Sequence, residues 1–362
     1  AIARFRERVV ALEETLARTL TQEVGKPIRQ SRNELKGLLA RLDFFLAESA
    51  RTLRDEKVLV DYAGKLEERI SHEPLGVVAN ISAWNYPYFV GSNVFVPALV
   101  AGNAVLYKPS EYATLTGLHI AELLHESGVP DDVFVPVIGG GETGAALLRQ
   151  PVDGVFFTGS YATGAKIAAI AGRRMIKVQL ELGGKDPVYV CEDVDVGATA
   201  AAVADGAFYN TGQSCCSVER IYVHRSIHAA FVDAFVAEVR GYRAGDPMDE
   251  ATYIGAITRR PQLDVLKRHG EPGAQRPRAH GRPRAVDRPQ EAPLPLAGKR
   301  REDLERPDSR LVHREVAFSR PLGDPGDLRK RRGLVDVQVI QYRPDDPRRG
   351  MPRRGQALHP SR

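Results

Sequence analysis

The chain has 362 residues, which is enough for two domains with buried cores of ordinary size. It contains no run of about 18 apolar residues that could cross a bilayer, and its first residues lack the pattern of a signal peptide, so we expect a cytoplasmic protein. The three cysteines, Cys191, Cys215 and Cys216, are too few for a disulfide framework and indicate free thiols.

Charge and proline divide the chain into two parts. Residues 1–262 carry a net charge of −5, whereas residues 263–362 carry +10 and hold 13 of the 24 prolines. Closely spaced Pro and Gly cannot continue a helix or a central strand, so we expect an irregular Arg/Pro-rich tail at 269–362. One hypothesis for this tail is a basic, disordered extension that binds nucleic acid.

The first part of the chain predicts two helices and a hairpin. Residues 3–20 repeat apolar side chains at helical spacing, and a second helix is predicted at about 33–50. Alternating side chains on either side of residues 63–64 favour a β-hairpin at about 56–72, which leads into a buried strand at Val77–Ile81.

From residue 77 onward, short runs rich in β-branched residues alternate with helical stretches. The runs are GVVANI, AVLYKP, VFVPVI, GVFFTG, IKVQLEL and PVYVC, and helices are predicted at 116–126, 144–150 and 164–171. This order is typical of an α/β fold with a largely parallel sheet covered on both faces. Ligands of such folds bind at the carboxyl ends of the strands, where the Gly-containing turns fall.

Two glycine-containing turns follow predicted strands. Gly139, Gly141 and Gly144 have G-x-G-x-x-G spacing, but no acidic residue follows about 20 positions later, so a tight turn explains them as well as a dinucleotide contact does. At Gly159-Ser160 a strand turns into a helix. The N-terminus of that helix would attract a phosphate, or Ser160 would simply cap the helix.

Two further segments carry candidate catalytic residues. In LELGGKDP, Glu181 lies between two leucines; apolar neighbours would raise its pKa and suit it to take a proton from water, and an exposed acid or a structural ion pair is the alternative. The following Gly183-Gly184 pair allows a reversal that would turn Glu181 into a cleft. In NTGQSCCSVERIYV, Cys215 precedes a strand, a setting that can present a nucleophilic thiolate.

Together, five segments resemble the aldehyde dehydrogenase superfamily in their order and spacing. They are ISAWNYP, YKPSE, FFTGSYATG, LELGGKDP and GQSCC, and 34 positions separate Glu181 from Cys215. The resemblance covers roughly residues 5–267. It implies a Rossmann-like cofactor-binding domain, an incomplete α/β catalytic domain, and oxidation of an aldehyde to a carboxylic acid with hydride transfer to NAD(P).

The resemblance implies roles for three catalytic residues. Cys215 would add to the aldehyde to give a thiohemiacetal, and Asn85 would donate its side-chain amide, with the backbone N–H of Cys215, to the oxyanion. Hydride transfer would leave a thioester, and Glu181 would activate the water that hydrolyses it. Members of the family that form acyl-CoA generally lack this carboxylate, so Glu181 argues against that branch.

The resemblance also implies a cofactor site of seven residues: Ile81, Ser82, Trp84, Lys108, Glu111, Gly159 and Ser160. Lys108 and Glu111 would bind the adenosine ribose hydroxyls, and Trp84 and Ser160 would lie near the pyrophosphate. Because the carboxylate of Glu111 would repel a 2′-phosphate, we predict NAD as cofactor, with NADP as the alternative, and no metal ion.

The predicted organisation is an NAD-binding domain at 1–182, with the bridging hairpin, and the first part of a catalytic domain at 183–268. The family's Glu-x-Phe-Gly-Pro segment and its final, subunit-pairing strand are not found in 269–362. We therefore favour a reading-frame shift near His269 over a nucleic-acid-binding tail. The resemblance implies a homo-dimer or tetramer for an intact member, and an inactive or cofactor-binding remnant is the alternative function for this chain.

Overall fold

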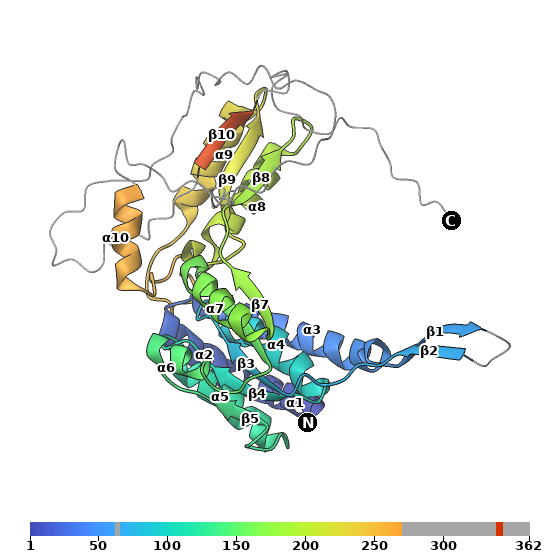
Figure 1. The fold of residues 1–362 in the computed structure, drawn as a ribbon. Coiled ribbons are helices and arrows are strands. Elements are labelled where there is room, and N and C mark those ends of the chain that lie inside the picture. Colours follow the sequence, from blue (N-terminus) through green and yellow to red (C-terminus); the bar gives the residue numbers. More distant parts are fainter. Residues whose placement is uncertain (62–65, 270–337, 343–362) are drawn as a thin grey trace, which may run out of the picture.

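The computed structural model describes residues 1–61, 66–269 and 338–342, and five of the ten strands in these residues form one large sheet (Figure 1). The five strands of this sheet are all parallel: β3 (Val77–Ile81), β4 (Ala104–Lys108), β5 (Phe134–Pro136), β6 (Gly154–Gly159) and β7 (Lys177–Leu182). Their order is β5-β4-β3-β6-β7. The chain adds β4 and β5 on one side of β3 and then crosses over to add β6 and β7 on the other side, so the switch point lies between β3 and β6. The predicted α/β fold is confirmed.

Seven helices accompany this sheet: α1 (Ile2–Ala11), α2 (Glu13–Val24), α3 (Ile28–Thr52), α4 (Pro87–Val100), α5 (Thr114–Glu126), α6 (Gly141–Leu147) and α7 (Tyr161–Arg174). On one face, Val78 of β3 belongs to a core built with α1 to α5; on the other, Ala79 packs in a second core with α6 and α7. Successive side chains of a strand point to opposite faces, so each face buries its own apolar set.

The predicted helices exist, but several of their boundaries were wrong. The single helix expected at 3–20 is broken at Leu12, whose φ of −112° and ψ of 12° lie outside the helical range, giving α1 and α2. The helix predicted at about 33–50 corresponds to α3, which begins earlier, directly after Pro27. The helix predicted at 144–150 corresponds to α6, which begins at Gly141. Apolar periodicity marks the buried face of a helix; it does not detect a local break or the first turn.

A hairpin and a second sheet complete the described structure. The predicted hairpin is confirmed as β1 (Glu56–Asp61) paired antiparallel with β2 (Leu66–Ile70), and it extends away from the body in Figure 1. The second sheet has parallel strands β8 (Asp186–Val190), β9 (Val218–His224) and β10 (Gln338–Tyr342), with α8 (Val196–Phe208) and α9 (His228–Gly241) packed beside it; α10 (Arg260–His269) follows.

The predicted tail at 269–362 lies mostly outside the described residues. Its strand β10 pairs with β9, an element that the sequence did not predict. Among the described helices, none is both long enough and apolar enough to cross a membrane.

Close packing of α7 on β7 depends on a glycine. A Cβ atom at Gly164 would lie 2.6 Å from Cδ2 of Leu182, which is closer than non-bonded carbon atoms approach each other in proteins. Gly172, in the same helix, would place a Cβ where no atom lies within 4 Å. The two glycines therefore differ in packing while sharing one helix.

We expect Gly164→Ala to lower the free energy of unfolding by about 1–3 kcal/mol, because the packed Leu182 side chain must leave its place or the helix must shift. The matched variant Gly172→Ala should raise it by roughly 0.5–1 kcal/mol, since alanine favours the helix. Urea unfolding followed by circular dichroism measures both, and a loss of equal size in the two variants would contradict the packing argument.

Candidate active site

The loop that carries Cys215 runs from the end of α8 to the start of β9. It begins with a short 3-10 turn, Tyr209–Gly212, in which Asn210 (φ 53°) and Thr211 (φ 58°) are left-handed. For residues other than glycine, this backbone conformation is unfavourable by roughly 1–2 kcal/mol, so the surrounding contacts must stabilise it. The turn leaves Cys215 exposed just before β9.

Asn85 is hydrogen-bonded to this loop, although 128 positions separate it from Gln213. Its Nδ2 donates to the Gln213 carbonyl at 3.0 Å. In return, Nδ2 of Asn210 donates to the carbonyls of Asn85 (3.3 Å) and Gln213 (3.2 Å). The structure thus brings the predicted oxyanion donor to the loop of the predicted nucleophile.

A second segment, residues 255–258, supports the same loop. The Gln213 side chain donates to the carbonyl of Ala256 at 3.0 Å and accepts from the N–H of Thr258 at 2.9 Å. The hydroxyl of Thr211 accepts from the N–H of Gly255 at 3.1 Å. Both sides of the turn are therefore fixed by backbone partners from a distant part of the chain.

Glu181 lies on β7, and its carboxylate is exposed. The expectation that its leucine neighbours form an apolar pocket around it was wrong: Leu180 and Leu182 pack into the sheet core, and alternate side chains of a strand point to opposite faces. Oε1 of Glu181 instead accepts from Nε2 of Gln179 at 3.2 Å.

The turn after β7 does approach the Cys215 loop. A Cβ at Gly184 would lie 3.8 Å from the Cys215 carbonyl oxygen and 2.7 Å from Oδ1 of Asp186. The LELGGKDP and GQSCC segments are therefore neighbours in space.

The thiol of Cys215 is harder to ionise than a free cysteine. Burial of the sulfur by surrounding atoms raises its pKa, and Cys216 raises it further, while backbone hydrogen bonds from both cysteines oppose the rise. Desolvation disfavours the charged form of the thiol, so these surroundings oppose formation of the thiolate that the sequence interpretation expects. The side chain of Cys216 lies 3.2 Å from the hydroxyl of Ser214.

The predicted cofactor residues lie at the carboxyl ends of β3, β4 and β6. Ile81 is the last residue of β3, and the N–H of Ser82 donates to the Lys108 carbonyl at 2.9 Å. After β6, Ser160 caps α7 by accepting from the N–H of Thr163 at 3.3 Å, as one of the two interpretations expected. These strand ends flank the switch point between β3 and β6, where open α/β sheets bind their ligands.

Lys108 and Glu111 form a polar corner at the end of β4. The Lys108 side chain is 5% exposed, and its Nζ donates to the Pro109 carbonyl at 3.1 Å and lies 3.9 Å from Oε2 of Glu111, which is 50% exposed. Burial lowers the pKa of Lys108, and Glu111 opposes that shift. A Cβ at Gly144 would contact the Lys108 stem at 3.6 Å, so the glycine turn lies against this corner.

The side chains of two predicted cofactor residues are partly or fully buried. The Trp84 ring is half-buried against the core of α1 to α5. The Ser82 hydroxyl is buried, and a Cβ at Gly91 would lie 3.4 Å from it, so this side chain faces α4. Only the backbone of Ser82 is available at the strand end.

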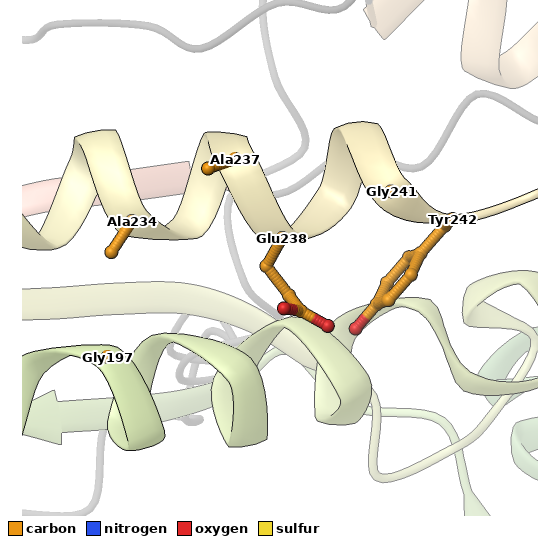
Figure 2. A pocket seen from close by; sticks show the side chains of 6 residues that line it. All are labelled: Gly197, Ala234, Ala237, Glu238, Gly241 and Tyr242. Carbon is orange, nitrogen blue, oxygen red and sulfur yellow. The ribbon is translucent and has the colours of Figure 1, made fainter.

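A groove of about 520 Å³ lies between α8 and α9 (Figure 2). Its lining consists of Gly197, Ala234, Ala237, Glu238, Gly241 and Tyr242. Glu238 and Tyr242 project from α9 toward α8 in Figure 2. None of the predicted site residues is in this lining, so the groove is separate from the Cys215 loop.

Sequence reasoning missed the buried polar residues behind the loop. Lys26, Gln30 and Glu34 are buried and reach the Asn85 and Asn210 segments through hydrogen bonds or ring contacts. The available signal was the presence of Gln30 and Glu34, one turn apart, among the apolar residues of α3. Starting the predicted helix at residue 33 hid it.

Comparisons with known proteins identify the family of this chain. The sequence profile described as the aldehyde dehydrogenase family matches residues 1–278, and the chain belongs to this family. A betaine aldehyde dehydrogenase of Brucella anthropi is 41% identical over 202 residues, 56% of this chain and 42% of the relative. The match to the family ends within the predicted tail.

Two further relatives match a larger part of the chain. A Mycobacterium ulcerans protein with the provisional name succinate-semialdehyde dehydrogenase (NADP(+)) 2 is 35% identical, over 74% of this chain and 52% of its own length. The crystal structure of an NAD-dependent aldehyde dehydrogenase from Sinorhizobium meliloti has a TM-score of 0.71 and 36% identity, covering 74% of this chain and 53% of its own. The chain thus spans about half the length of the curated relatives it matches.

The raised pKa of Cys215 predicts slow alkylation at neutral pH. Because only the thiolate reacts, the rate with iodoacetamide should rise with pH through a midpoint above that of N-acetylcysteine, and Cys216→Ser should move this midpoint down. Peptide mass spectrometry that distinguishes the two adjacent cysteines measures the rates. A midpoint at or below that of the free thiol would contradict the structure.

Proposed function

We propose that the protein oxidises an aldehyde to a carboxylic acid, with NAD as hydride acceptor and NADP as the alternative. The observation that supports this most directly is the set of hydrogen bonds joining Asn85 to the loop of Cys215. These bonds hold the Asn85 segment against the loop that carries Cys215. Family membership gives the same reaction class.

The sulfur of Cys215 would attack the aldehyde carbon, and the carbonyl oxygen would become an oxyanion. An asparagine amide has two N–H donors, and the bond to Gln213 uses one of them, so Asn85 keeps one for the oxyanion. Because the pKa of Cys215 is raised, the thiol would lose its proton as the sulfur adds, and solvent water at the exposed Cys215 would accept that proton. The aldehyde-derived C–H bond would then lose its hydrogen as hydride, for which a nicotinamide cofactor would be the acceptor, and the acyl group would remain on the Cys215 sulfur as a thioester.

Glu181 would take a proton from the water that attacks this thioester. Its exposed carboxylate is open to solvent, and the turn at Gly184 lies next to the Cys215 backbone. A general base needs both access to water and a place within reach of the reacting carbon. The acyl group would leave as a carboxylate, and the thiol would be restored.

The residues at the strand ends fit a dinucleotide. The carboxylate of Glu111 is half-exposed and can accept from ribose hydroxyls, with Lys108 beside it. Gly159 and Ser160 precede the N-terminus of α7, which favours phosphate. The Sinorhizobium meliloti relative is named NAD-dependent and the Mycobacterium ulcerans relative carries NADP(+) in its name, so both cofactors remain in the proposal.

Residues 1–182 would form the NAD-binding domain and 183–268 the first part of the catalytic domain. The partner would be a small-molecule aldehyde, and the intact protein would be a homo-dimer or tetramer. We do not propose nucleic acid as a partner. The frame shift near His269 stays a prediction, which the nucleotide sequence around that codon would test.

A second candidate is a protein that binds the dinucleotide without turnover. It is favoured by one observation: the family match stops at residue 278, whereas the sequence continues to residue 362. Cofactor binding uses the large sheet, which is described throughout, whereas aldehyde binding requires the region around Cys215. The two candidates therefore differ in turnover and not in NAD binding.

The full chain with NAD and a panel of aldehydes should produce NADH, followed by absorbance at 340 nm. Cys215→Ser should reduce the rate by a factor of about 10³ or more because the nucleophile is lost, while Cys191→Ser, at a thiol away from the loop, should retain it. Full activity in Cys215→Ser would refute the proposed chemistry. Absence of turnover, with NAD binding retained, would favour the second candidate.

NAD binding can be measured separately because Trp84 is the only tryptophan of the chain and lies in the segment after β3. We expect NAD to quench its fluorescence, and Glu111→Gln to weaken NAD binding about tenfold while weakening NADP binding less. Glu73→Gln, on the exposed segment before β3, is the matched control. Equal weakening for both cofactors would contradict the role of Glu111.

A further inference from the structure

Two buried polar side chains, Gln30 and Glu34, lie one turn apart on the same face of α3. Residues four positions apart in a helix have Cβ atoms about 6 Å from each other. Burial of such groups is unfavourable unless each finds its hydrogen-bond partners. The partners of these two side chains lie in the two segments that meet at the proposed active site.

Glu34 holds the segment that contains Asn85. Its Oε1 accepts from the backbone N–H groups of Tyr88 (2.9 Å) and Phe89 (3.2 Å), which are orphan donors in the first turn of α4. The other oxygen pairs with Nζ of Lys26, and both side chains are 0% exposed. The carboxylate thereby fixes where α4 begins, directly after Asn85 and Tyr86.

Lys26 contacts the same segment from the other side. Its Nζ lies 3.8 Å from the centroid of the Tyr86 ring, within the range of a cation–π interaction. Lys26 therefore both balances the charge of Glu34 and orients the residue that follows Asn85.

Gln30 holds the loop that contains Cys215. Its Oε1 accepts from the backbone N–H of Asn210 at 2.8 Å, and its Nε2 donates to the Tyr253 carbonyl at 3.1 Å. Asn210 is the left-handed residue whose side chain donates to Asn85 and Gln213. One amide thus supports the strained turn directly.

We infer that α3 sets the distance between the oxyanion donor and the nucleophile, with Gln30, Glu34 and Lys26 as positioning residues. This inference rests on the proposed function of Asn85 and Cys215. A helix is rigid, so two segments bound one turn apart on it keep a fixed separation. Reacting groups must be placed to within about 1 Å, because such a misplacement alone costs about 10²-fold in rate.

The test uses Gln30→Met in the full chain, which keeps the side-chain length and removes both hydrogen bonds. We expect kcat for aldehyde oxidation to fall about 10- to 100-fold with KM for NAD within about twofold. Ser31→Ala is the matched control: Ser31 is buried on the same helix and its hydroxyl lies 2.8 Å from that of Thr21, away from both segments. It should lose stability without this loss of kcat.

A double-mutant cycle separates positioning from general destabilisation. If Gln30 acts through Asn85, Gln30→Met should lower kcat by less than about threefold in an Asn85→Ala background. Asn210→Gly keeps the left-handed backbone and removes the side-chain donor, so it should lower kcat as Gln30→Met does. It replaces Gln30→Met in this test if Gln30→Met does not fold. Effects that multiply independently would overturn the inference.

A measurement without turnover separates failure of the inference from failure of the proposed function. We expect Gln30→Met and Asn210→Gly to change the ratio of Cys215 to Cys191 alkylation by iodoacetamide at least threefold, and Ser31→Ala to leave it unchanged. An unchanged ratio in both loop variants overturns the role of α3 even in an inactive chain. A changed ratio in a chain without Cys215-dependent turnover supports the positioning and refutes the proposed reaction.

Discussion

The Glu34 carboxylate has no exposed surface, and this one buried charge constrains much of the surrounding structure. In an apolar interior it must be neutralised and its oxygens must be bonded, and the donors are Lys26 and two backbone N–H groups of α4. Burial lowers the pKa of Lys26, and the contact with Glu34 opposes this shift, so each charge depends on the other. The start of α4, and with it the turn at Asn85, follows from this pairing.

The sheet supplies the other half of the arrangement. Parallel strands end at one edge, so the residues after β3, β4 and β6 gather there although up to about eighty positions separate them. The chain then leaves β7 through Gly183-Gly184 and enters the smaller sheet, where the loop before β9 carries Cys215 back toward this edge. Backbone connectivity thus places the strand ends proposed to bind the dinucleotide and the Cys215 thiol on adjoining elements.

Much of this could be predicted from sequence, because strands such as Val77–Ile81 are short apolar runs between clear turns. The helix α4 could not, since it is apolar on most sides and contains Pro97, which removes the usual period. The motifs located Cys215, Asn85 and Glu181, but the surroundings of Glu181 depended on strand alternation, which a list of sequence neighbours ignores. Gln30 was missed because the predicted helix began at residue 33, and its bond to Asn210, 180 positions away, could not be foreseen from neighbouring residues.

The two left-handed residues before Cys215 have a consequence for how the protein would lose activity. Asn210 and Thr211 hold an unfavourable backbone only while Gln30 and Gly255 bond to them, so this turn is less stable than the sheet that it adjoins. Mild urea would then relax the turn first. Turnover would disappear at concentrations where circular dichroism still reports an intact fold, and dilution would restore it quickly, because only a few dihedral angles would have changed.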